Sequence, residues 1–170
     1  MKQQLNFAFT GPESSGKSTL SKALAQLYKG TFHPEYAREF LTLTNGKYEL
    51  IDLDTIAVGQ KDQWKKNETN LNFYDTEMLV IKIWSEFKYN QCSDIISNAF
   101  LNQQVNHYFL CFPDIPYEYD QFRENENDRF ELFELYLKTL KEHKLPYSII
   151  KGSLNERIKK CSEIIAPPLK

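Results

Sequence analysis

Short apolar segments alternate with longer segments of helical periodicity along this chain. Apolar runs of four to six residues, rich in β-branched and aromatic side chains, predict buried strands. These runs occupy residues 5–10, 31–36, 71–74, 108–112 and 147–150.

The longer segments carry apolar residues three and four positions apart, which is typical of one buried helix face. Leu20, Leu24 and Leu27 share such a face. We predict helices at 18–29, 53–66, 77–89, 93–103, 129–143 and 154–165. Because strands that alternate with helices pair in parallel, the pattern predicts an α/β fold with a five-stranded parallel sheet flanked by helices.

The composition is that of an ordinary globular protein, with 41% hydrophobic and 26% charged residues. A length of 170 residues predicts one domain over residues 1–170. Aromatic residues make up 14% of the chain, so we expect a ring-rich core. The net charge of -2 argues against binding of duplex nucleic acid through a basic surface.

Three cysteines, Cys92, Cys111 and Cys161, lie far apart and form no Cys-x-x-Cys pair. The sequence therefore predicts neither a disulfide framework nor a zinc site, and a reducing cytosol fits. The apolar start is too short for a signal peptide, and no apolar run approaches the roughly 20 residues of a membrane span. We expect a soluble cytoplasmic protein with no membrane partner.

Residues 11–18 read Gly-Pro-Glu-Ser-Ser-Gly-Lys-Ser and match the phosphate-loop pattern G-x-x-x-x-G-K-[ST] in full. The glycines let the backbone turn its N–H groups toward phosphate oxygens, and the following helix points its positive N-terminus at the same anion. Lys17 can bridge the β- and γ-phosphates of ATP, and the Ser18 hydroxyl can coordinate Mg²⁺. The predicted ATP-binding residues are Gly11, Pro12, Glu13, Ser14, Ser15, Gly16, Lys17, Ser18 and Thr19.

Asp75 follows the apolar run 71–74, at the strand end where such sheets bind ligands. Its carboxylate could hold Mg²⁺ through water or accept a proton from an attacking hydroxyl. An aspartate after a strand is also typical of a helix N-cap. With the phosphate loop in the same chain, we interpret Asp75 as a metal-binding and catalytic residue.

A second cluster, Glu35-Tyr36-Ala37-Arg38, lies at the end of the predicted strand 31–36. P-loop kinases usually hold the acceptor on this side, opposite the phosphate loop. The Glu35 carboxylate can bind or deprotonate a sugar hydroxyl, and Tyr36 can stack on a planar base. The same spacing also fits the start of a surface helix with charge pairs.

Residues 114–134 are strongly acidic but contain Arg123 and Arg129. Arginines delivered by a closing lid stabilise the charge that phosphoryl transfer spreads over the equatorial oxygens. We therefore predict a lid-like segment at about 117–130 with both arginines catalytic. Alternatively, both arginines are exposed and balance the local carboxylates.

Taken in order, these motifs resemble those of the ribosylnicotinamide kinase (NadR-like) family of small P-loop kinases. The resemblance covers nearly the whole chain. It rests on residues 11–19, 35–40, 56–60, 73–77, 82–87, 113–117 and 152–157, and on Asp120 with Arg123. The chain departs from the family in Tyr117, where a Trp is usual, and in Glu77, where a second Asp is common. Both positions could border the acceptor pocket.

The resemblance implies transfer of the ATP γ-phosphate, with Mg²⁺, to the 5′-hydroxyl of nicotinamide riboside, giving nicotinamide mononucleotide. It implies an acceptor site made by Glu35, Tyr36, Arg38, Trp84, Tyr117 and Asp120, and adenine near Gly152 and Ser153. The helical spacing of Trp84 also fits a core position. Because the phosphate loop begins at residue 11, we expect the kinase domain alone, without an adenylyltransferase or helix-turn-helix domain.

The general base is open between Asp75 and Glu35, and we favour Asp75. Three other functions stay open: a kinase for another nucleoside, a kinase for a nucleoside monophosphate, and a regulatory module that senses nucleotides without turning them over. A monophosphate kinase would need further cationic groups for the acceptor's phosphate. The expected partner is a small molecule rather than nucleic acid, and the oligomeric state is left open.

Overall fold

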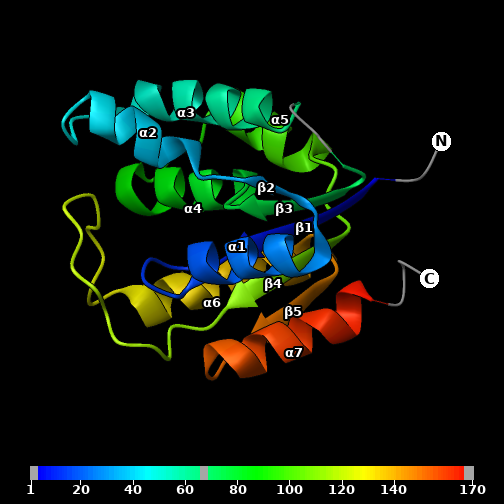
Figure 1. The fold of residues 1–170 in the computed structure, drawn as a ribbon. Helices are drawn as coiled ribbons and strands as arrows, with labels where there is room; N and C mark the ends of the chain where they lie inside the picture. The colour runs from blue at the N-terminus through cyan, green and yellow to red at the C-terminus, as the bar shows by residue number, and fades with distance from the viewer. Residues whose placement is uncertain (1–3, 66–68, 167–170) are drawn as a thin grey trace.

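Five strands pair in parallel into one sheet in the computed structural model, which describes residues 4–65 and 69–166. The order across the sheet is β2-β3-β1-β4-β5, so β1 lies in the middle. The strands are β1 (Leu5–Thr10), β2 (Thr31–His33), β3 (Leu71–Asp75), β4 (His107–Cys111) and β5 (Tyr147–Ile150). The predicted α/β fold with a five-stranded parallel sheet is confirmed (Figure 1).

Within the described residues, seven helices cover the two faces of the sheet. They are α1 (Lys17–Tyr28), α2 (Tyr36–Leu43), α3 (Leu50–Gln63), α4 (Met78–Tyr89), α5 (Asp94–Asn102), α6 (Arg129–Glu142) and α7 (Leu154–Ile165). Helices α1 and α7 pack on one face, and α2 to α6 pack on the other. In the part of the chain that is described, no helix has the length and apolar character needed to cross a bilayer.

The alternation of side chains along β1 divides the core between the two faces. Phe7 and Phe9 point toward α1 and α7, whereas Ala8 belongs to the opposite cluster. The Phe7 ring stacks on Phe73 at 6.0 Å and on Phe109 at 5.8 Å between centroids. Each such buried ring contributes about 1.5–3 kcal/mol relative to an exposed one. The expected ring-rich core is therefore present.

The second strand is shorter than predicted, because β2 ends at His33. Pro34 follows it and has no N–H to donate to the sheet. The chain then turns into α2, which confirms the alternative interpretation of residues 35–38 as the start of a helix. The backbone N–H of Tyr36, at the start of α2, donates to Oε1 of Gln60 (2.9 Å). A tertiary contact therefore satisfies an N–H group at the helix N-terminus.

Two further differences concern helix ends. Helix α3 begins at Leu50 rather than residue 53, because Glu49 and Asp52 form a reciprocal capping box. The predicted end of this helix at residue 66 lies outside the described residues. In α1, Leu27 is 59% exposed rather than inward, and Tyr28 packs on Phe73 in that last turn.

Candidate active site

The loop between β1 and α1 has the backbone conformation of a phosphate-binding loop. Its φ angles are positive at Gly11 (127°), Ser14 (51°) and Gly16 (83°). A Cβ at Gly11 would lie 2.8 Å from the carbonyl oxygen of Cys111, so only glycine fits there. No side chain caps the N-terminus of α1. Its first N–H groups are therefore available to an anion, and the loop fits a phosphate.

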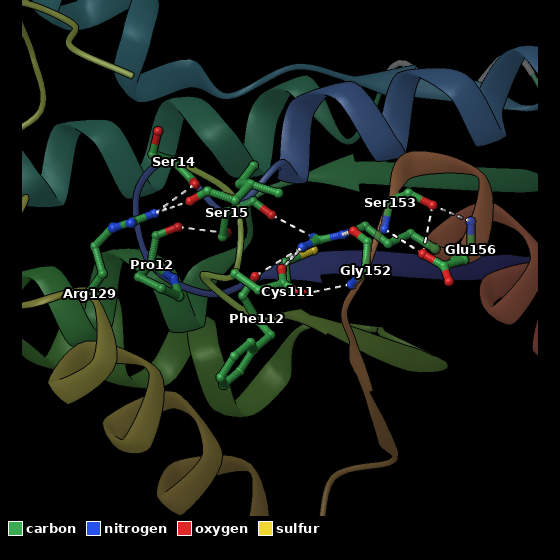
Figure 2. Close-up of polar contacts among 12 residues, drawn as sticks. Pro12, Ser14, Ser15, Cys111, Phe112, Arg129, Gly152, Ser153 and Glu156 are labelled. Carbon is green, nitrogen blue, oxygen red and sulfur yellow. Dashed lines mark hydrogen bonds and ion pairs between the residues drawn. The ribbon is translucent and has the colours of Figure 1, made fainter. Parts of the chain in front are cut away.

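The Pro12 carbonyl of this loop is hydrogen-bonded by side chains of the same loop. The Pro12 carbonyl accepts from Nζ of Lys17 (2.6 Å) and from Oγ of Ser15 (2.8 Å). The Lys17 ammonium therefore lies against the backbone of the loop. Figure 2 shows the contact between Ser15 and the Pro12 carbonyl.

A cavity of about 470 Å³ opens beside the loop, large enough for a nucleotide-sized ligand. One wall is the whole phosphate loop, from Gly11 to Thr19. The other walls come from the start of α2, one face of α4, and the segment between β4 and α6. We call this segment, residues 112–128, the lid segment. The other lining residues include Glu35, Arg38, Tyr48, Trp84, Phe87, Lys88, Arg123 and Glu124.

Two carboxylates at the strand ends have raised pKa values. Burial and, next, the Asp75 charge raise the pKa of Glu35 to about 7, although Lys17 and Arg38 act in the opposite direction. Burial also raises the pKa of Asp75, and the Ser18 hydroxyl and Lys17 oppose that shift. Glu35 lines the cavity, whereas Asp75 is only 4% exposed.

Asp75 suits an oxygen-coordinated cation. Its buried Oδ1 has no hydrogen-bond partner among the described residues, which is unusual for a carboxylate at this depth. Together with the Ser18 hydroxyl it forms the hard-oxygen donor set that Mg²⁺ prefers. The N-cap of α4 is not Asp75 but Glu77, whose carboxylate accepts from the N–H of Leu79 (2.6 Å). Glu77 is fully buried, so it does not border the cavity.

The lid segment carries both predicted arginines to the phosphate loop. Nη1 of Arg123 donates to Oγ of Ser14 (3.2 Å), and Arg123 lines the cavity. Nη1 of Arg129 donates to the carbonyls of Ser14 (3.2 Å) and Ile115 (3.0 Å). The Arg129 guanidinium also lies 5.7 Å from the centre of the Tyr117 ring. Neither arginine is a free surface charge, but Arg129 binds the backbone of the loop and does not line the cavity.

Further contacts hold the lid segment against the phosphate loop, α2 and α4. The Glu13 carboxylate of the phosphate loop accepts from the backbone N–H groups of Glu124 (3.1 Å) and Asn125 (3.0 Å). The Glu124 carboxylate pairs with Lys88 of α4 (2.8 Å).

On the α2 side, Arg38 pairs with Asp120 (2.8 Å) and holds the pKa of that carboxyl below its usual range. Two of the predicted acceptor residues are thus bound to each other.

Tyr48, Trp84 and Lys88 line the cavity and contact one another. The Trp84 indole N–H donates to the Tyr48 hydroxyl (3.0 Å), and the two rings meet edge to face at 4.8 Å. The Lys88 ammonium lies 4.2 Å from the centre of the Tyr48 ring. Trp84 therefore packs against its neighbours and lines the cavity at the same time. Tyr48, Lys88 and Glu124 were missed by the sequence reasoning, and only Lys88 gave a signal, four residues after Trp84 on one helix face.

Several predicted site residues do not line the cavity: Tyr36, Asp75, Tyr117, Asp120, Arg129, Gly152 and Ser153. The Tyr36 ring packs on α3, where a Cβ at Gly59 would lie 2.2 Å from it. Gly152 and Ser153 form the turn between β5 and α7, where Ser153 caps the helix. The N–H of Gly152 donates to the carboxylate of Asp114 (2.7 Å).

Comparisons with known proteins agree with this fold. The family model described as "AAA domain" matches residues 6–157. No curated protein sequence matches the chain. Two crystal structures of NadR protein, one in complex with NAD and AMP-PNP and one in complex with NR, are similar, with a TM-score of 0.79 and 20% identity over 94% of this chain.

The chain spans about half of those NadR chains, 49% and 50% respectively. Deoxyadenosine kinase from M. mycoides with bound products has a TM-score of 0.65 and 14% identity, over 95% of this chain and 99% of that one. At these identities the likeness is one of fold.

Proposed function

The chain belongs to the AAA domain family, and on this premise we propose that it is an ATP-dependent kinase for nicotinamide riboside. It transfers the γ-phosphate to the 5′-hydroxyl and gives nicotinamide mononucleotide. The observation that carries this proposal is a single cavity lined by both the phosphate loop and the half-buried Glu35. A phosphate site and a proton acceptor that share one cavity are what transfer to a hydroxyl requires.

Each wall of the cavity has its role in this proposal. The loop N–H groups and Lys17 hold the phosphates of ATP. Asp75 and Ser18 hold Mg²⁺, which when bound neutralises phosphate charge. Arg123, already at the Ser14 hydroxyl, donates toward the transferred group.

We assign the general base to Glu35 rather than to Asp75, which the sequence favoured. Glu35 lines the cavity, and its pKa of about 7 suits a group that takes a proton near neutral pH. The Glu35 carboxylate accepts the hydroxyl proton while the oxygen bonds to phosphorus and the bond to the departing ADP breaks. Asp75 is buried beside Ser18, which supports the metal-holding role.

The charges around the acceptor end favour a nucleoside over a nucleoside monophosphate. Arg38 is paired with Asp120, and Lys88 with Glu124. A phosphorylated acceptor would have to compete with these carboxylates for its counter-charges. The Trp84 and Tyr48 rings, which line the cavity, favour a pyridinium nucleoside through cation–π contact. The NadR structure in complex with NR adds support through its fold.

The test is ADP release with Mg²⁺-ATP and nicotinamide riboside, with the product identified by mass spectrometry. Lys17→Ala should abolish the reaction, because it removes the charge that binds the phosphates. The matched control is Lys22→Ala, an exposed lysine on the same helix, which should leave the rate unchanged.

A nucleoside panel that includes deoxyadenosine separates the alternatives. Phosphorylation of a different nucleoside would support the proposed kinase activity and identify a different acceptor. Binding of ATP without ADP release in the presence of any acceptor would favour a nucleotide-sensing module over a kinase. Absence of ATP binding would contradict both.

A further inference from the structure

Arg157 of α7 joins three segments that are far apart in the sequence. It is only 3% exposed. Its Nη1 donates to the carbonyl of Ser15 (2.7 Å) and its Nε to the carbonyl of Gly152 (2.8 Å). Its Nη2 donates to the carbonyl of Phe112 (3.1 Å) and forms an ion pair with Asp114. Figure 2 shows the acceptor residues Ser15, Phe112 and Gly152, which come from the phosphate loop, the start of the lid segment and the turn before α7.

The contact with Ser15 has a direct consequence for the phosphate loop. Successive N–H groups can face an anion only if the carbonyls of the same peptides face away from it. A carbonyl turned toward the protein interior needs a donor there, because an unpaired buried carbonyl is costly. For Ser15 that donor is Arg157, and for Ser14 it is Arg129.

Asp114 fixes the direction in which Arg157 donates. Its carboxylate binds Nη2 of Arg157 and also accepts from the N–H of Gly152. The pair therefore fixes the 152–153 turn and the phosphate loop relative to each other. A charged donor held by a carboxylate and three carbonyls has little freedom to reorient.

We propose that Arg157, held by Asp114, is a positioning residue that fixes the phosphate loop in its anion-binding conformation and so sets the affinity for nucleotide di- and triphosphates. It acts through the Ser15 carbonyl and does not itself touch the phosphates. The inference rests on the proposed function only in assuming that the loop binds nucleotide. The acceptor and the transfer step are not involved.

The experiment measures binding of Mg²⁺-ADP and of inorganic pyrophosphate by calorimetry, without acceptor. Arg157→Met should weaken both ligands by about 10- to 100-fold, as expected when a supporting residue of a preorganised site is lost. Arg157→Lys keeps the positive charge but not the planar set of guanidinium donors, so its affinities should be intermediate. Ile165→Ala is the matched control, since Ile165 is fully buried on the same helix and does not contact the loop.

Stability and positioning are separated by adding Asp114→Asn to Arg157→Met. Removing the unpaired carboxylate should recover part of the lost thermal stability. It should not recover affinity, because the Ser15 carbonyl still has no donor. Affinity that follows melting temperature across all variants, including Ile165→Ala, would overturn the inference.

Unchanged affinity in Arg157→Met would overturn this inference and leave the proposed kinase intact. Failure of the unaltered protein to bind either ligand would overturn both. If Arg157→Met does not fold, the comparison of Arg157→Lys with Ile165→Ala decides the question in the same way.

Discussion

Glu35 is the residue whose ionisation should control turnover. Only its deprotonated form can accept a proton, and its pKa is about 7. We therefore expect kcat to fall as the pH drops below about 7 and to level off above it. Glu35→Gln should lower kcat by roughly 10²- to 10⁴-fold above pH 7 and by progressively less at lower pH, where the unaltered protein also loses its base. Glu39→Gln, an exposed carboxylate one turn later in α2, is the control and should keep both the rate and the pH profile. A variant Glu35→Gln with normal turnover would return the role of base to Asp75.

Asp75 should be needed for the metal rather than for the proton. Its unpartnered buried oxygen is a ligand that an amide replaces poorly. Asp75→Asn is expected to raise the Mg²⁺ concentration for half-maximal rate by roughly tenfold or more, by analogy with the loss of a group that supports a metal site. Titration of the rate with Mg²⁺ at saturating substrates checks this. A loss of kcat that no Mg²⁺ concentration reverses would instead support a direct role in proton transfer.

At the scale of elements, the ion pair between α4 and the lid segment should assist closure. Lys88 and Glu124 are 35% and 43% exposed, so their pair contributes at most about 1 kcal/mol. Lys88→Met should therefore raise the acceptor KM only about two- to fivefold, with a smaller effect on kcat. Lys138→Met breaks the exposed pair with Glu142 on α6 and serves as the control. The acceptor KM of the unaltered protein should rise with salt, and that of Lys88→Met should rise less.

The packing of α2 on α3 depends on Gly59. Replacing a mid-helix glycine by alanine normally stabilises a helix by about 0.5–1 kcal/mol. Here the new methyl would lie 2.2 Å from the Tyr36 ring, and such overpacking costs about 1–3 kcal/mol. Because the second effect is larger, we expect Gly59→Ala to lower the melting temperature by a few degrees. Val58→Ala, at a half-exposed neighbour, should change it little. A higher melting temperature in Gly59→Ala would show that Tyr36 moves aside without cost.

The elements that the sequence predicted well are those whose pattern is local. The bounds of β1, β5 and α7 agree residue for residue with the prediction. An apolar run marks each of the two strands, and a Ser-x-x-Glu capping box marks the start of α7. For α2 the sequence offered a helix start only as an alternative and did not predict the helix's extent. Its start depends on Gln60, 24 residues later in the chain.

The same distinction applies to the site. The phosphate loop is contiguous, so its motif predicted every residue from Gly11 to Thr19 that lines the cavity. Arg157 lies 142 residues from the Ser15 carbonyl that it binds, and Lys88 lies 36 from Glu124. Contacts of this kind follow from the sheet topology, which brings the segments together only in the folded chain.

For the whole molecule, the strand order explains where the cavity lies. The chain leaves β1 on one side for β2 and β3 and crosses to the other side for β4 and β5. The loops after β1 and β4 therefore diverge, which is the position where open parallel sheets bind ligands. Asp75 pairs in register with Phe9, next to the start of the phosphate loop. Burying carboxylates at this edge of the sheet lowers the free energy of unfolding of the whole protein when they are ionised.

That cost should appear in the pH dependence of stability. The pKa of Glu35 rises from 4.5 to about 7 on folding, so the folded state binds the proton more tightly than the unfolded state. Its contribution to stability is then fully present below pH 4.5 and is lost as the pH rises toward about 7. Glu35→Gln cannot ionise and should be as stable as the unaltered protein at pH 4. At pH 8 it should be more stable by about 2 kcal/mol, after allowance for the partial exposure of Glu35. Urea unfolding at the two pH values measures this difference. A variant that is inactive yet more stable at pH 8 would show that the fold gives up stability to hold this carboxylate, whereas equal stability at both pH values would mean that Glu35 is not desolvated.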